Sequence, residues 1–220
     1  MDLYEVMRTT PAVREFTDDP LPDTVLSRIL DNARFAPNGG NRQGVQVIVV
    51  RDERTKSTLA DLALPSARRT AAQIANGESP WNPLYPSSVD ASTIAKTEVP
   101  PEASSAFRSA PVVLVICLDL AVVAATDQEL DRISVVPGAS VYPFVWNVLL
   151  AARNEGYGGV LTTAAVSEEP EVKRLLSVPD RYAITAVVPL GTPVRQVSKL
   201  RRKPVPEFVT RETFDGNPFV

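Results

Sequence analysis

The chain has 220 residues, of which 44% are hydrophobic, so it can bury one good core and is expected to form one domain, residues 1–220. Its formal net charge is -3 and its basic residues are spread among acidic ones, which argues against nucleic acid and anionic membranes as partners. With no histidine and one cysteine, the chain cannot form a Ser-His-Asp triad, a Cys-His pair, a zinc site of the usual ligand set or an internal disulfide, and we expect no metal site.

The first part of the chain predicts one helix and one strand. The N-terminal residues carry charges where a signal peptide needs an apolar run, and no later apolar segment reaches the roughly 20 residues that span a bilayer, so we expect a cytoplasmic protein. Apolar residues recur at helical spacing between Pro22 and Pro37, which predicts a helix over about 22–35. The β-branched run Gln46–Val50 predicts a buried strand.

Residues 77–101 form a long segment rich in proline, serine and threonine, with two embedded aromatics, Trp81 and Tyr85. A loop of this length in a compact domain is usually functional or disordered. The aromatics favour a lid over a pocket, and a surface loop with two pinned aromatic side chains is the alternative.

The second half of the chain predicts two strands and two helices. The strands cover residues 112–118 and Ala183–Leu190. Cys117 lies in the first of them, where a thiol behaves as a small buried hydrophobe. The helix Ala139–Asn154 is apolar on most sides and therefore belongs inside the fold, whereas Glu169–Leu176 carries a conventional apolar stripe.

The last segment, residues 195–220, has a basic stretch followed by three phenylalanines without clear periodicity. Such a tail needs another surface to cover its aromatic side chains. We expect the partner subunit of a homodimer to supply that surface, since helix-free arms commonly cross between protomers.

Two glycine-containing segments are candidates for ligand contact. In Ala36–Gln43, two glycines let the backbone approach a ligand closely, and Asn38 and Asn41 offer donors and acceptors. A turn that caps the preceding helix is an equal alternative. In Gly156–Ala164, glycines and small residues describe a backbone that lies flat against another group with N–H donors available. This segment follows a helix, so it is not a dinucleotide-binding fingerprint, and Gly156 is expected to end that helix.

Basic residues cluster at opposite ends of the chain. The clusters are Arg8 with Arg14, and Lys199, Arg201, Arg202 and Lys203. Each alone is more often a solvated charged face. Arginine side chains match the oxygens of a phosphate in bidentate geometry, so the two clusters also suit a bound phosphate.

Four motifs occur in a fixed order along nearly the whole chain. They are Arg-Thr-Thr-Pro-Ala-Val-Arg-Glu-Phe near the start, Ala-Pro-Asn-Gly-Gly-Asn-Arg-Gln after the first long helix, Gly-Tyr-Gly-Gly-Val-Leu-Thr-Thr after the apolar helix, and a late Arg-Arg-Lys-Pro. Together they resemble the nitroreductase family of FMN-dependent oxidoreductases. The resemblance implies an α+β fold, with a central, mostly antiparallel sheet flanked by helices. It also implies a homodimer that exchanges its C-terminal arms and holds two FMN molecules at its interface.

The resemblance further implies which residues hold FMN. The phosphate and ribityl chain would be bound by Arg8, Thr10, Arg14, Arg201 and Arg202. The strip along the flavin would be Pro37, Asn38, Gly39 and Asn41, with Ser140 from the other subunit. The backbone of Leu161, Thr163 and Ala164 would cover one ring face and donate to flavin N5. The sequence departs from a common family pattern at Pro11-Ala12 and at Gly44-Val45, which leaves the phosphate contacts near Pro11 open.

The activity that the resemblance implies is a ping-pong exchange. NADH or NADPH gives hydride to FMN, and a nitroaromatic, quinone or similar electron-poor aromatic then takes the electrons. The flavin carries this chemistry, so no side chain is expected to be catalytic. Two alternatives stay open. One is another flavin enzyme on the same scaffold, such as a dehalogenase or a flavin-consuming enzyme, and the other is a protein that stores or senses FMN without turnover.

Overall fold

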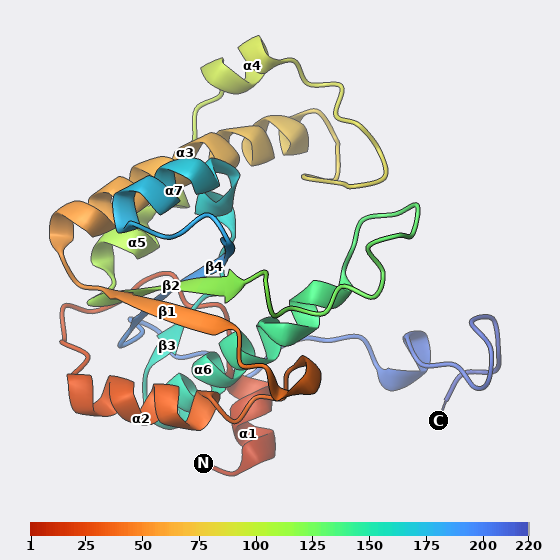
Figure 1. The fold of residues 1–220 in the computed structure, drawn as a ribbon, viewed down its shortest axis with the longest axis horizontal. Helices are drawn as coiled ribbons and strands as arrows, with labels where there is room; N and C mark the ends of the chain where they lie inside the picture. The colour runs from red at the N-terminus through yellow and green to blue at the C-terminus, as the bar shows by residue number, and fades with distance from the viewer. Residues whose placement is uncertain (220) are drawn as a thin grey trace.

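A four-stranded antiparallel sheet forms the centre of the computed structural model, which describes residues 1–219 (Figure 1). Its strands are β1 (Val45–Val50), β2 (Val112–Asp119), β3 (Gly158–Gly159) and β4 (Tyr182–Gly191), in the order β1-β2-β4-β3. Every residue of β2 is buried, as expected for an unbroken apolar run covered on both faces. The predicted α+β fold and its three longer strands are confirmed, and β3 is a short addition.

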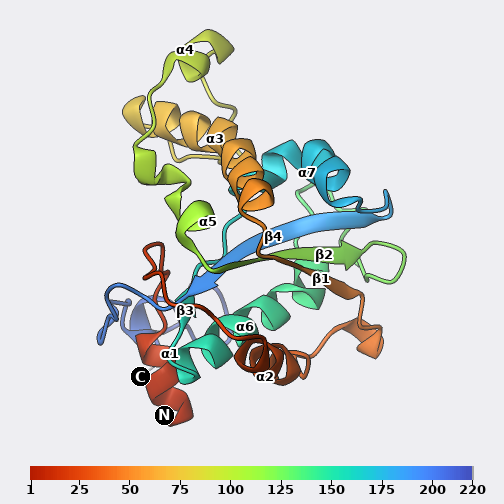
Figure 2. The same ribbon diagram turned by 90° about the vertical axis from the view of Figure 1, so that its left-hand side faces the viewer.

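One face of the sheet is covered by α2 (Asp23–Ala33) and α6 (Tyr142–Asn154), which pack against each other (Figure 2). The helix α1 (Leu3–Thr9) contacts α6 from outside. The predicted helix from residue 139 begins three residues later than expected. Residues Val136–Ser140 form a 3-10 turn instead, and Pro143 stands in the first turn of α6, where its missing N–H costs nothing.

The other face of the sheet carries α3 (Glu53–Ala75), α5 (Ser105–Ser109) and α7 (Glu169–Leu176), above a second apolar cluster (Figure 2). The sequence analysis did not predict α3, which has 23 residues. It begins at the cap residue Asp52, whose carboxylate accepts from the Thr55 N–H at 2.8 Å.

Two smaller expectations, at Cys117 and Gly156, are confirmed by this fold. Cys117 is buried, and burial raises the pKa of its thiol to about 11. Gly156 follows α6 at a φ of 88°, in the left-handed region that favours glycine. No helix within residues 1–219 is long and apolar enough to cross a membrane.

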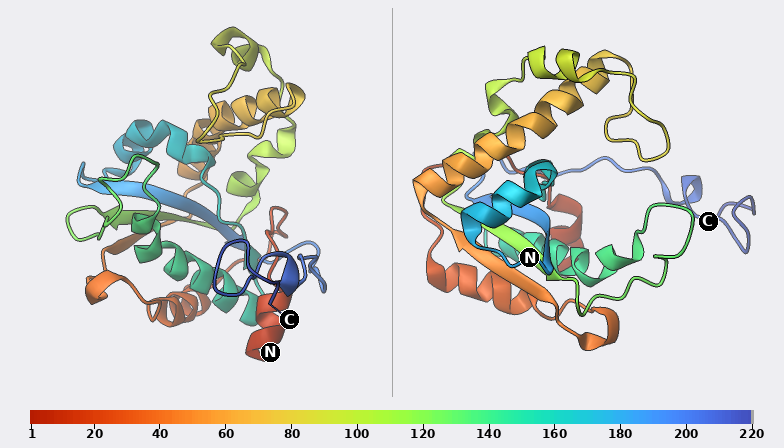
Figure 3. Two further views of the ribbon diagram at one scale, coloured as in Figure 1. Left: turned by 90° about the vertical axis from the view of Figure 1, so that its right-hand side faces the viewer. Right: turned by 45° about the horizontal axis from the view of Figure 1, so that its top comes forward.

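The segments expected as lid and arm both leave the compact body (Figures 1 and 3). The lid segment contains a short helix, α4 (Ala91–Lys96). The C-terminal segment extends along the long axis of the molecule and contains one 3-10 turn, Val205–Glu207. Phe208 and Phe214 in this segment are exposed to solvent. Val220, the last residue of the expected arm, lies outside the described residues.

Lys56 ties the start of α3 to the end of α5. Its side chain is 3% exposed, and its ammonium donates to the carbonyl oxygen of Ala110 at 2.7 Å and pairs with Glu53 at 2.8 Å. A hydrogen bond to a charged group contributes about 1.5–3 kcal/mol, and its loss leaves the Ala110 carbonyl without this donor. We expect Lys56→Met to lower the free energy of unfolding by this amount in urea titrations. Lys96→Met, on the exposed face of α4, is the matched control and should change it by less than about 0.5 kcal/mol.

Candidate functional site

The N-terminal segment lies directly beside the glycines of β3. The Val13 N–H donates to the Gly159 carbonyl oxygen at 2.9 Å. A Cβ at Gly158 would meet the Val13 side chain at 2.7 Å, and one at Gly159 would meet the Leu190 side chain at 2.5 Å. The flat backbone predicted here therefore lies against the protein's own Val13 and Leu190. This close approach brings the Arg8–Arg14 region alongside the segment that follows β3.

Arg8 and Arg14 are both exposed, and neither forms an ion pair or a side-chain hydrogen bond within residues 1–219. The Arg8 guanidinium lies 5.9 Å from the centre of the Tyr4 ring. Thr10 differs, because it is buried and its hydroxyl donates to the Val6 carbonyl oxygen at 2.7 Å. The two arginines are thus available to an anion, whereas the hydroxyl proton of Thr10 is already used.

The segment after β3 is held to β4 through Thr162. Its N–H donates to the Val187 carbonyl oxygen at 3.0 Å, and the Val187 N–H donates back at 2.8 Å. Because side chains and N–H groups alternate in extended backbone, the next residue, Thr163, turns its N–H away from β4. Thr163 is exposed, and its N–H donates to no acceptor in the described part of the chain. The Ala164 N–H, by contrast, donates to the Thr162 hydroxyl at 3.2 Å.

A cavity of about 480 Å³ lies over this segment. Thr163 and Ala164 line one side of it, Ser66 and Thr70 of α3 line another, and Trp81 of the lid segment closes the edge. Of the two aromatics in this segment, Trp81 lines the cavity, whereas Tyr85 does not line it and is 71% exposed.

The lid segment is held in place by a carboxylate. Glu78 accepts from the hydroxyls of Ser87 and Ser88 at 2.7 and 2.8 Å, and from the Ser88 N–H at 2.9 Å. These hydrogen bonds, first that of Ser87 and then those of Ser88, lower the pKa of Glu78 to about 2. The carboxylate is therefore ionised at neutral pH, the state in which it accepts these three hydrogen bonds.

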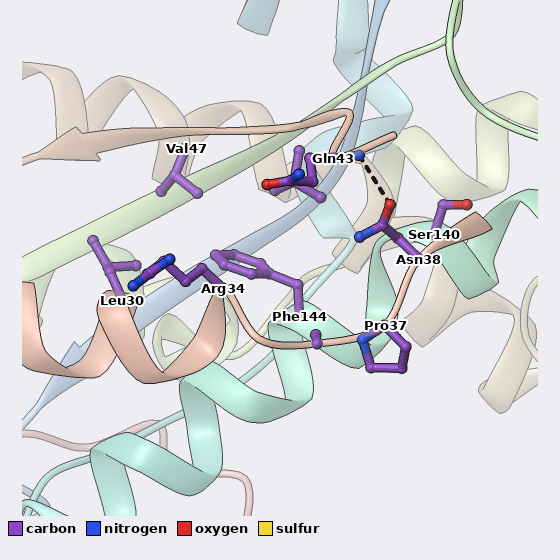
Figure 4. Close-up of a pocket in the computed structure, with 10 residues that line it drawn as sticks. Leu30, Arg34, Pro37, Asn38, Gln43, Val47, Ser140 and Phe144 are labelled. Atoms are coloured by element: carbon purple, nitrogen blue, oxygen red, sulfur yellow. Dashed lines mark hydrogen bonds between the residues drawn. The ribbon is translucent and has the colours of Figure 1, made fainter. Parts of the chain in front are cut away.

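The strip after α2 lines a different cavity, of about 230 Å³ (Figure 4). Pro37 and Asn38 face it together with Ser140 and Phe144. The Asn38 side chain accepts from the Gln43 N–H at 2.9 Å, which closes the turn between them. Gly39 and Asn41 belong to this turn, which is tight enough to hold Gly40, Asn41 and Gln43 at positive φ.

Ser140 corrects one expectation. It was expected from the other subunit, but a Cβ at Gly39 would lie 3.6 Å from the Ser140 hydroxyl oxygen of the same chain. Ser140 lies at the end of the 3-10 turn that precedes α6, and α6 packs against α2, which ends just before the strip. The strip and Ser140 are therefore one unit of one chain.

The structure brings the candidate residues into two groups and leaves a third apart. The cavity at Thr163 and the cavity at Asn38 have no lining residue in common. Arg201 and Arg202 line neither of them, and the side chain of Arg202 donates to the Arg201 carbonyl oxygen at 2.7 Å. One chain thus carries two separate cavities lined by candidate residues, and a basic segment that projects from the body (Figure 1).

The sequence analysis missed the contribution of α3 to the first cavity. Ser66 and Thr70 are one helical turn apart and so share a face of α3. The signals were present, because Asp52 is a good cap residue and Leu59 and Ala63 recur at helical spacing.

Comparisons with known proteins agree with this architecture. A sequence model of the nitroreductase family matches residues 7–192. An NADH dehydrogenase of Thermus thermophilus is 29% identical over 199 residues, 90% of each chain. The iodotyrosine dehalogenase 1 homolog of Caenorhabditis elegans is 26% identical over 210 residues, which are 94% of this chain but 60% of that protein.

Solved structures share the fold at lower identity. An iodotyrosine deiodinase bound to FMN and 3-iodo-L-tyrosine has a TM-score of 0.70 at 22% identity, covering 97% of this chain and 100% of that one. The NADPH:FMN oxidoreductase of Vibrio harveyi, complexed with NAD+, has a TM-score of 0.67 at 19% identity, covering 96% and 77%. The family match spans most of the chain and coincides with the sheet and both helical layers described above, so this chain belongs to the nitroreductase family.

Proposed function

We propose that this chain is a single-domain, FMN-dependent NAD(P)H oxidoreductase that works as a homodimer and reduces electron-poor aromatics such as nitroaromatics or quinones. The observation that carries the proposal is the exposed Thr163 N–H, which has no acceptor within residues 1–219 and lies beside a cavity. An N–H donor fixed in this way suits a ring nitrogen that gains electron density on reduction. The FMN and NAD+ named with the structural relatives support the same reading.

The residues present fit FMN. Its phosphate carries close to two negative charges, and Arg8 and Arg14 are exposed cations without a partner among the described residues. Leu161, Thr163 and Ala164 would lie against one ring face. When bound, FMN would take hydride from NADH or NADPH and pass the electrons to the acceptor. The protein's own task is then to hold the phosphate, orient the ring and limit access of water.

The division into two partial sites supports a homodimer. The strip Pro37–Asn41 and Ser140 of one chain would complete the site at Thr163 of the other. Exposed apolar side chains lie on α1, at Leu3, Tyr4 and Met7, and on α6, at Tyr142 and Trp146, as expected for a surface that is covered in a dimer. We propose that the arm, residues 195–220, crosses to the partner and brings Arg201 and Arg202 to the phosphate.

Dehalogenation is the second candidate function. It is favoured by the two iodotyrosine-processing relatives, one similar in sequence over 94% of this chain and one similar in fold. Both candidate reactions use the same cofactor site. They differ in the acceptor, which the cavity beside Trp81 would select.

The experiment that tests the proposed function uses the protein as purified. We expect a yellow dimer that releases FMN, rather than FAD, on denaturation, and that oxidises NADH or NADPH when a nitroaromatic or quinone is added. Size-exclusion chromatography with light scattering, chromatography of the released flavin and the loss of nicotinamide absorbance are the measurements. Halide release from iodotyrosine without nitroaromatic reduction would favour the second candidate. A colourless monomer that cannot be reconstituted with FMN would contradict both.

Charge at the phosphate can be separated from stability. Arg14→Ala should weaken FMN binding by about 1.5–3 kcal/mol, the range for a hydrogen bond to a charged group. Thermal stability without flavin should change little, since Arg14 makes no ion pair within residues 1–219. Arg54→Ala, exposed on the far end of α3, is the control. An equal loss of stability with and without FMN would make Arg14 structural.

The donor at Thr163 can be tested by two substitutions. Thr163→Ala keeps the N–H and should leave flavin reduction nearly intact, whereas Thr163→Pro deletes it. Loss of a donor aimed at the reacting centre can slow a reaction by about 10²-fold. The rate of flavin bleaching by NAD(P)H in a single turnover is the measurement, after each variant is checked for folding and flavin content. Equal slowing by alanine and proline would identify the hydroxyl as the working group.

A further inference from the structure

The cavity beside Thr163 is lined without any charged side chain. Five hydroxyl-bearing residues surround it, namely Ser66, Thr70, Thr162, Thr163 and Ser167. Trp81 is the one aromatic ring among the described lining residues. Such a cavity offers hydrogen bonds to oxygen atoms and a flat apolar surface to a ring. Its lining alone gives no preference for the charge of a ligand.

Trp81 is held in position by α3. Its backbone has a φ of 55°, a left-handed conformation that is unusual for a bulky residue and persists only where surrounding contacts enforce it. Its N–H donates to the side-chain oxygen of buried Gln73 at 3.1 Å, and its indole N–H donates to the Thr70 hydroxyl at 2.9 Å. The lid segment accordingly turns back beside the end of α3 (Figure 3).

Arg69 supplies the third contact and has a charge without a counter-charge. Its guanidinium lies over the Trp81 ring, 4.2 Å from the ring centre. It forms no ion pair and no hydrogen bond within residues 1–219, and its Nε is buried without an acceptor. Two other cations on or against α3 do have a carboxylate partner: Lys56 pairs with Glu53, and Arg108 pairs with Asp61.

A partly buried cation is unfavourable unless an anion or an acceptor accompanies it. Trp81 lines the cavity, and its ring also stacks on the Arg69 guanidinium, which places this cation next to a residue of the cavity lining. A negative charge on a ligand in the cavity would therefore be attracted to Arg69.

We propose that this cavity selects flat aromatic acceptors that carry a negative charge, such as a ring carboxylate. The Trp81 ring would contact the aromatic ring, and Arg69 would provide the counter-charge. This inference deepens the proposed function and rests on it for the reaction, but not for the binding preference. A neutral aromatic of the same shape would make the same ring contacts and lack the attraction.

Two nearly isosteric compounds separate charge from shape: 4-nitrobenzoate and 4-nitrobenzamide. With the flavin-loaded protein, we expect kcat/KM to favour the benzoate. In Arg69→Gln the ratio of the two kcat/KM values should fall about fivefold, as expected for the loss of one partly screened charge interaction. Arg68→Gln makes the same change of charge at the neighbouring position, where the side chain does not stack on Trp81, and should leave the ratio unchanged.

A binding measurement keeps the test independent of turnover. The chain has two tryptophans, so Trp146→Phe leaves Trp81 as the sole indole fluorophore. Quenching of its emission should show tighter binding of the benzoate than of the amide, and Arg69→Gln in this background should remove the difference. If neither compound is reduced but this pattern holds, the proposed function fails and the charge preference stands.

Three results would overturn the inference. The first is equal binding of both compounds by the protein with Arg69 intact. The second is an equal loss of preference in Arg68→Gln, which would indicate a general field of the helix. The third is a loss of FMN from Arg69→Gln with both compounds weakened alike, which would assign Arg69 to the cofactor.

Discussion

The pairing of β4 with its neighbours is the constraint on which both the core and the candidate site depend. On one side β4 pairs with fully buried β2, and on the other it pairs with the glycines of β3. Beyond β3, Val187 of β4 holds Thr162 by two hydrogen bonds. The position of the Thr163 N–H is therefore set by the sheet register. A shift of one residue would turn that N–H toward β4 and remove it from the cavity.

The elements that could be predicted from the sequence are those with strong apolar periodicity. The apolar run of β2 and the apolar residues of α6 predicted a buried strand and a buried helix. Both elements are buried in the structure, so the amino-acid pattern and the environment agree. The helix α3 was missed although it is the longest described element. Its stripe is interrupted by Pro65, and its buried face includes Lys56 and Gln73, whose polar groups bond to the Ala110 carbonyl oxygen and to the Trp81 N–H, both beyond the end of the helix. A pattern built on apolar residues cannot register such positions.

The candidate site divides in the same way. The strip at Asn38 and the segment at Thr163 were chosen as candidates because each is a local motif that can be recognised in the sequence. That Ser140 lies on the same chain as the strip depends on the packing of α6 against α2, which the sequence does not contain. The environment of Arg69 could not be predicted either, since a sequence shows a charged residue but not whether a carboxylate lies near it. The aromatics of the lid were noticed, yet only the contacts to Thr70 and Gln73 distinguish Trp81 from Tyr85.

In the proposed reaction FMN would carry the electron transfer, so the task of the chain is to place dipoles and charges around it, and packing does this. The Thr163 N–H is aimed by the sheet, and the hydrogen bond from Val13 to Gly159 holds the N-terminal segment that carries Arg8 and Arg14 against β3. The strip at Asn38 lines a separate cavity, so in the proposed homodimer FMN would bind between the strip of one chain and Thr163 of the other. Binding of that ligand and dimerisation would then stabilise each other, because each is favoured by the state that the other requires. The proposed substrate cavity is preorganised in a similar way. Contacts to α3 hold the Trp81 ring and the Arg69 cation in position without a substrate. Binding would therefore require little further ordering of the protein.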